Sequence, residues 1–167
     1  MVSWSRTSLE PPGAFWRFSL GFYQRPGVAA TCLDLQDRFG RDVNLLLFAC
    51  WVGISGRGRL SVADLAKAEA VVEPWRRAVV EPLRLVRKLV KEESDSAELY
   101  AALQSVELKA ERQAQNRLEL LAPKTTETTG VARLDDAYAN LTLYLGRGAA
   151  YGAAAPIRMA LTAEVGS

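Results

Sequence analysis

Apolar residues recur three and four positions apart along most of the chain, and few stretches alternate between apolar and polar. The first spacing is typical of a helix with one buried face, whereas alternation is typical of a strand. The sequence therefore predicts an all-α protein: a compact, orthogonal or bundle-like domain of five to six helices, followed by an irregular or weakly helical C-terminal segment. The expected helices run from near Pro12 to Tyr23 and over 28–39, 43–53, 62–72, 75–93, 96–121 and 131–145.

Capping residues and prolines set the expected helix ends. Asp42 is a good N-cap for the third helix, and Ser61 to Asp64 has the capping-box spacing that opens the fourth. Pro74 is expected to kink the chain or to start a new helix there. Pro82 lies inside the next apolar pattern and is expected to bend or split that helix near Val80.

The chain is divided into three parts by this pattern. Residues 1–13 are expected to be an N-terminal extension, 14–122 a helical core domain, and 123–167 a polar linker with a C-terminal helical tail. The tail is the least regular part, because 146–155 is rich in Gly and Ala and 156–164 predicts only one or two weak turns. The sequence leaves three roles open for the tail: docked on the core, covering a partner site, or mobile.

Composition excludes several kinds of chemistry. The 167 residues contain no histidine, and 21 Lys and Arg face 19 Asp and Glu, a net charge of +2. A Ser-His-Asp or Cys-His site within this chain is thereby excluded, and so is a di-iron bundle that needs Glu-x-x-His motifs. We therefore predict no cofactor and no metal as the default reading.

The two cysteines and the longest apolar run indicate where in the cell the protein is expected. Cys32 and Cys50 lie in apolar segments without a Cys-x-x-Cys spacing, which favours buried free thiols in a reducing compartment. The longest apolar run, 45–54, has ten residues, whereas a membrane span needs about 20. No secretory signal is recognised at the N-terminus. The sequence thus predicts a cytoplasmic protein without a membrane partner.

The segment 75–91 is locally basic, with six cations and one acid. Its cations are Arg76, Arg77, Arg84, Arg87, Lys88 and Lys91. One interpretation pairs this row with acids of the sixth helix, such as Glu107 and Glu111. Another lets the row bind an anionic small molecule or a protein partner. Nucleic-acid binding through the same helix is a weaker alternative, because the net charge of the chain is near zero.

The acidic residues offer a second kind of site. Asp34, Asp37 and Asp42 cluster around the second helix and its turn, and Glu107 and Glu111 are one helical turn apart. Carboxylates on facing helices could bind Mg²⁺. The alternative is structural, with Asp42 as a cap, Asp37 paired with a nearby arginine, and the glutamates paired with the basic row.

Two tryptophans and three polar residues form the constellation of most interest for a site. Trp51 and Trp75 are expected in the core, where their indole N–H groups need partners. A polar pocket is expected where these rings meet Asp37, Asn44 and Arg84. Such a pocket is either an ion-pair network or a ligand site.

Several motifs occur in order along the chain. They are Phe15–Leu20, Leu33–Asp37, Asp42–Trp51, Trp75–Arg87 and Glu107–Arg112. Together, over residues 15–121, they resemble a small uncharacterised proteobacterial family classed as a domain of unknown function, with LQDxxGxDVNxLLFxxW and WxxxVVxPLRxxR patterns. The resemblance implies that certain polar and aromatic residues belong to the family pattern. These are Gln36, Asp37, Asp42, Asn44, Trp51, Arg84, Arg87, Glu107 and Glu111.

The leading hypothesis from the sequence is a non-enzymatic helical interaction or assembly protein, with a protein partner or a second copy of itself. It is motivated by the missing catalytic motifs and by an aromatic first helix. The alternatives are a small anionic-ligand or Mg²⁺ site built from Asp, Glu and Arg, and nucleic-acid binding through 75–91. The sequence does not decide whether the protein is an enzyme.

Overall fold

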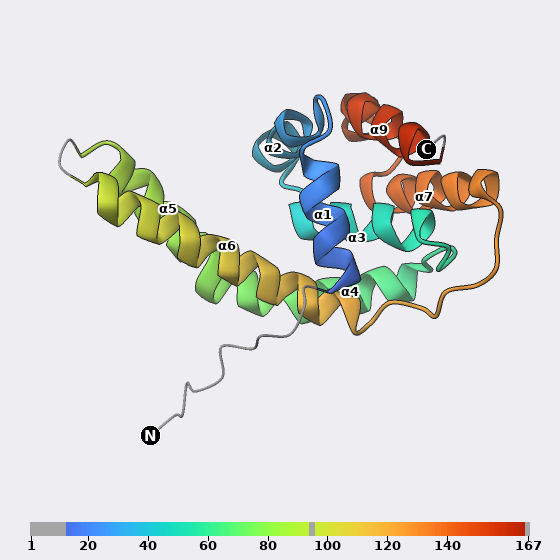
Figure 1. Ribbon diagram of the computed structural model, residues 1–167, viewed down its shortest axis with the longest axis horizontal. Coiled ribbons are helices and arrows are strands. Elements are labelled where there is room, and N and C mark those ends of the chain that lie inside the picture. The colour runs from blue at the N-terminus through green and yellow to red at the C-terminus, as the bar shows by residue number, and fades with distance from the viewer. Residues whose placement is uncertain (1–12, 94–95, 166–167) are drawn as a thin grey trace, which may run out of the picture.

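The computed structural model describes residues 13–93 and 96–165. Within these ranges the chain forms helices and no strand, which confirms the predicted all-α class (Figure 1). The helices are α1 (Ala14–Tyr23), α2 (Val28–Phe39), α3 (Val43–Ile54), α4 (Val62–Trp75), the π-helical η1 (Arg76–Val80), α5 (Glu81–Lys91), α6 (Ala97–Glu119), α7 (Gly130–Leu145), α8 (Ala149–Ala153) and α9 (Ala155–Val165). The predicted helix start near Pro12 lies outside the described residues.

Helix α3 lies at the centre of the body, and its residues from Asn44 to Gly53 are all buried. The carboxylate of Asp42 caps the helix by accepting hydrogen bonds from the backbone N–H groups of Asn44 and Leu45, at 2.8 and 3.1 Å. Helix α7 packs along α3, and α1, α2, α6 and α9 also contact it. A helix that is apolar on every side is stable only when it is enclosed in this way.

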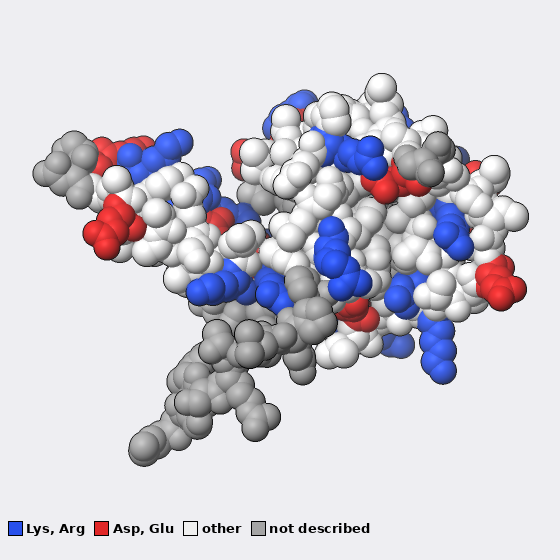
Figure 2. Space-filling view, in the orientation of Figure 1, with Lys and Arg blue, Asp and Glu red and all other residues white. Residues whose placement is uncertain are grey.

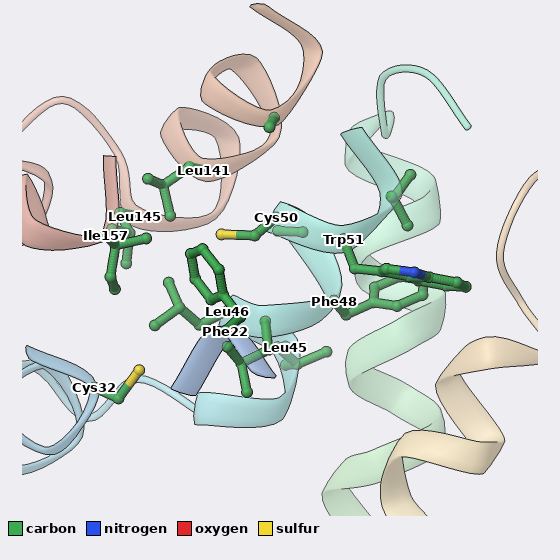
Figure 3. Packing of buried hydrophobic residues seen from close by; sticks show 14 of the residues in the cluster. Phe22, Cys32, Leu45, Leu46, Phe48, Cys50, Trp51, Leu141, Leu145 and Ile157 are labelled. Atoms are coloured by element: carbon green, nitrogen blue, oxygen red, sulfur yellow. The ribbon is translucent and has the colours of Figure 1, made fainter. Parts of the chain in front are cut away.

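The C-terminal helices belong to the same hydrophobic core as α3. In Figure 3, Cys50 of α3 points toward Leu141 and Leu145 of α7, and Ile157 of α9 lies on the same side. These α7 and α9 side chains are at most 3% exposed. Of the three roles left open for the tail, the structure shows docking on the core. The core therefore includes side chains on both sides of residue 122.

The Gly- and Ala-rich end of the chain is more helical than its composition suggested. Helices α8 and α9 replace the irregular segment and weak turns expected over 146–164. Ala150 and Ala154 are buried, and both helices pack against α2. Alanine has a high helix propensity, and its small side chain lets two backbones approach closely. Packing, rather than an amphipathic pattern, thus stabilises these two short helices.

The prolines act differently from each other. Pro74 does not end α4, which continues beyond the predicted end at Val72 as far as Trp75. The predicted split near Val80 is present as a change from the π-helical η1 to α5. Pro82 lies in the first turn of α5, where the ring is tolerated because an early helical N–H needs no helical acceptor.

Helix α5 and the outer part of α6 form an arm that extends away from the body (Figure 1). We define the arm as residues 81–93 and 96–108. No residue of α5 is buried, and α5 packs mainly on α6 and η1. The inner part of α6 is different, because Ala110, Ala114 and Leu118 are buried in the body. Helix α6 thus joins the arm to the body.

Candidate functional site

Two arginines of the basic row are paired with glutamates of α6. Arg84 donates from Nε to Glu107 Oε1 at 3.4 Å and from Nη2 to Glu111 Oε1 at 2.8 Å. Arg87 donates from Nε to Glu107 Oε2 and from Nη2 to Glu107 Oε1. All four side chains are at most 24% exposed. The prediction that the basic row pairs with acids of the sixth helix is therefore confirmed for Arg84 and Arg87.

The network continues from α6 to the start of α3. Asn44 donates from Nδ2 to Glu111 Oε2, and Gln115 donates from Nε2 to Asn44 Oδ1 at 3.0 Å. Gln115 Oε1 is buried and has no hydrogen-bond partner among the described residues. We call Asn44, Arg84, Arg87, Glu107, Glu111 and Gln115 the polar network. It joins α5, α6 and α3 where the arm meets the body.

Asp42 lies beside this network as a cap with several partners. Its Oδ2 is 3.5 Å from Arg76 Nε. Its backbone N–H donates to the hydroxyl of Tyr144 at 2.7 Å, and that hydroxyl donates to the Asp42 carbonyl at 3.1 Å. Asp42 thus connects α3 to η1 and to α7, which explains an acid at this position without a ligand.

Burial changes the protonation of both carboxyl groups. Loss of hydration raises the pKa of Glu111, while the hydrogen bond from Asn44 and the charge of Arg84 act in the opposite direction. Burial likewise raises the pKa of Asp42, partly offset by its backbone hydrogen bonds and by Arg76. The folded protein therefore holds these two protons more tightly than the unfolded chain does.

Replacing Glu111 by Gln is expected to flatten the pH dependence of stability. A carboxyl whose pKa is raised by folding contributes stability below its unfolded pKa of about 4.3, and loses that contribution as the pH rises through the folded pKa. The free energy of unfolding of the wild type minus that of Glu111→Gln should thus fall as the pH rises above about 4. Urea unfolding at several pH values measures this difference. A difference that grows with pH would contradict the burial of Glu111.

The other three residues of the predicted pocket have contacts of their own. Trp75 Nε1 donates to the carbonyl of Ala110 at 2.9 Å, on the body side of the network. Trp51 stacks on Phe15 with ring centroids 5.0 Å apart. Asp37 is exposed and forms no ion pair within the described part of the chain. Exposed Asp37 thus does not join the hydrogen bonds of Asn44 and Arg84, which run to Glu107, Glu111 and Gln115.

The predicted pairing of Asp37 with a neighbouring arginine is wrong. Arg38 pairs with Asp34 one turn earlier, with Nη1 3.0 Å from Asp34 Oδ2. Arg41 instead reaches the carbonyl of Leu145 at 3.5 Å. Asp37 is therefore a surface carboxylate in this fold.

Sequence reasoning missed Gln115 and Tyr144. Gln115 lies one turn after Glu111, so the four-residue spacing of Glu107, Glu111 and Gln115 could have indicated a continuous polar face on α6. Tyr144 gave no such signal, because it contacts Asp42 only through the packing of α7 on α3. A contact across about one hundred residues depends on tertiary structure alone.

Few side chains of the polar network are available to bind a ligand or to react. Arg84 and Arg87 are both paired with carboxylates, so an anionic ligand would have to displace Glu107 or Glu111. Among residues 13–93 and 96–165, no group of three or more His, Cys, Asp or Glu side chains is placed to hold a metal ion. Both cysteines are free and buried, and burial raises the pKa of Cys32 to about 12. The arrangement can hold three helices together, and it contains no activated nucleophile.

A helix that spans a membrane needs about 20 mostly apolar residues. None of the described helices is long and apolar enough to cross a bilayer.

Comparisons with known proteins point to one family. The model of a family described as "Protein of unknown function (DUF2390)" matches residues 14–118. The match begins with α1 and ends one residue before the end of α6. A search of curated proteins and a search of solved structures gave no match.

Proposed function

The chain belongs to this family of unknown function, and we propose that it is a non-enzymatic interaction protein that binds a protein partner through its arm. The proposal concerns the surface of α5 and the outer part of α6. It is supported by one observation above others, the apolar side chains that this surface leaves exposed.

Six of the fourteen exposed large hydrophobic residues in the described chain lie on the arm. They are Leu85, Val86, Leu89, Leu99, Val106 and Leu108, each 44–60% exposed. The arm contributes only 26 of the described residues, so these side chains are concentrated there. Leu99 and Val106 lie two turns apart on one side of α6, and Val86 lines the same groove as Val106. Single exposed hydrophobic residues are ordinary, whereas a group on one face indicates a binding surface.

One face of the arm is also hollowed. A shallow apolar groove runs between the end of η1, α5 and α6. It is lined by Ala78, Val79, Pro82, Leu83, Val86, Leu103 and Val106. Two helices that pack only on each other leave one such face open, and helical proteins usually cover it with another layer. An apolar helix is the kind of partner that fits a groove of this composition.

Polar substitutions on the arm are expected to abolish partner binding without unfolding the protein. In the double variant Leu89→Lys/Leu99→Lys, both changed side chains are already more than half exposed. The free energy of unfolding should therefore change by no more than about 0.5 kcal/mol per site. Binding is measured by chemical cross-linking in cells that produce tagged protein, followed by identification of the cross-linked species.

Met159→Lys is the matched control, because Met159 is an exposed apolar residue of α9 that lies outside the arm. The wild type and the control should give the same cross-linked species, and the arm variant should lose them. Equal cross-linking in all three proteins would refute the proposal.

A further inference from the structure

We propose that the partner of the arm is the arm of a second copy of this chain, with the two α6 helices antiparallel. In this pairing Glu98 lies against Lys109 of the second copy, and Lys109 lies against Glu98 of the second copy. The inference rests on the proposed function and adds the identity of the partner. It is carried by the order of apolar, small and charged residues along the exposed side of α6.

The exposed side of α6 has the spacing of a coiled-coil seam. Leu99, Ala102, Val106, Lys109 and Gln113 follow one another at steps of three, four, three and four residues, and all are exposed. Such steps keep one stripe of a helix facing a neighbouring helix. An antiparallel copy centred near residue 104 places Ala102 opposite Val106 of the second copy. The small alanine allows the two helices to approach closely at the middle of the seam.

Opposite charges lie at the two ends of this seam. Glu98 is at the outer end of the arm, and Lys109 is eleven residues further, about 16 Å along the helix, where the arm meets the body. Both side chains are exposed, and neither has an ion-pair partner among the residues that the structure describes. An antiparallel pair brings Glu98 of each copy against Lys109 of the other, so the same attractive contact forms once at each end of the seam.

The reverse orientation is disfavoured by charge. The outer end of the arm carries exposed Glu92, Glu93 and Glu98 together with exposed Lys88 and Lys91, and Figure 2 shows both acidic and basic side chains there. Along the seam, a parallel pair would place Glu98 against Glu98 and Lys109 against Lys109 of the second copy, and like charges at an interface are repulsive. Charge complementarity therefore favours the antiparallel pair.

The surface of α6 beyond Lys109 is exposed and can contact the second arm. Along the same side of α6, Gln113, Asn116 and Leu120 are exposed, although the opposite side of the helix is buried in the body. The outer end of the second arm can therefore extend past the base of the first. On the other helix, Pro82 and Val86 widen the contact from α6 to α5. The result is a closed pair related by a twofold axis, in which both copies use the same surface.

Charge reversal tests this pairing on the purified full-length chain. Sedimentation velocity is measured for the wild type, Glu98→Lys, Lys109→Glu and the double variant Glu98→Lys/Lys109→Glu, from about 1 to about 200 µM. The wild type is expected to dimerise, and each single variant is expected to raise Kd about tenfold or more, because two attractive pairs become repulsive. The double variant restores opposite charges and should dimerise more tightly than either single variant.

Each outcome decides between the two proposals. A wild type that stays monomeric over the whole range overturns the second copy as the partner, and so does a double variant that is no tighter than the single variants. If the wild type is monomeric while cross-linking in cells still depends on Leu89 and Leu99, the arm binds a different protein and the proposed function stands. Met159→Lys is again the control and should dimerise as the wild type does. All variants are checked for an unchanged Tm, since the altered residues are exposed.

Discussion

A chain that ends at Ala122 is expected not to fold. The truncation removes α7, α8 and α9, and with them four large apolar side chains that are 0–3% exposed: Leu141, Leu145, Ile157 and Leu161. Burial of one such side chain contributes about 1.5–3 kcal/mol, so the four together contribute about 6–12 kcal/mol. A typical domain is stable by only about 5–15 kcal/mol in total. The loss is therefore comparable to the whole free energy of folding.

The measurement is circular dichroism with thermal unfolding, combined with size-exclusion chromatography. The truncated chain should lack a cooperative transition. It should also aggregate, because the loss of α7, which makes the most extensive contact with α3, exposes apolar side chains of α3. Residues 123–167 supplied as a separate peptide are the control, and they should restore a cooperative transition. A truncated chain that unfolds cooperatively on its own would contradict the role of α7 and α9 in the core.

This prediction also concerns the extent of the family match, which ends at residue 118. Helix α3 lies inside the matched region, yet its most extensive contact is with α7, which lies outside it. The matched region therefore cannot bury its own central helix.

The helices near the N-terminus could be predicted from local chemistry. The second and third helices have clear ends, because Gly40 adopts a left-handed conformation at φ 62° and Asp42 caps the following turn. The C-terminal helices could not be predicted in the same way. Their alanines form no amphipathic stripe, and both helices are held by packing: α8 and α9 contact α2 and α7, and α9 also contacts α3. Local sequence is informative where capping residues decide a structure, and uninformative where tertiary packing decides it.

The polar network was predictable in part. Opposite charges on two neighbouring amphipathic helices indicated the pairing of Arg84 and Arg87 with Glu107 and Glu111. The direction in which Asp37 points could not be read from the same pattern, because it depends on how α2 crosses α3. A charge pattern therefore identifies which helices pair, and the crossing geometry decides which side chains meet.

The second large effect is a loss of stability expected on substitution of Gly53, where α3 packs closely on α7. A Cβ atom at this position would lie 2.2 Å from the backbone N and 2.3 Å from the Cα of Ala137. It would also lie 2.7 Å from the carbonyl carbon of Asp136. These are backbone atoms of α7 that cannot rotate away, so Gly53→Ala must push α3 and α7 apart. Overpacking a core usually costs about 1–3 kcal/mol, and we expect Gly53→Ala to destabilise by about 3 kcal/mol or more.

Gly21→Ala is the matched control for this substitution. Gly21 also lies within a helix, but nothing is within 4 Å of a Cβ atom added there. Alanine is the better helix former, so Gly21→Ala should stabilise the protein by about 0.5–1 kcal/mol. The same chemical change should thus have opposite signs at the two positions in urea unfolding. If both variants are stabilised, the backbones of α3 and α7 are further apart than the structure places them, and α7 is not the close cover of the central helix.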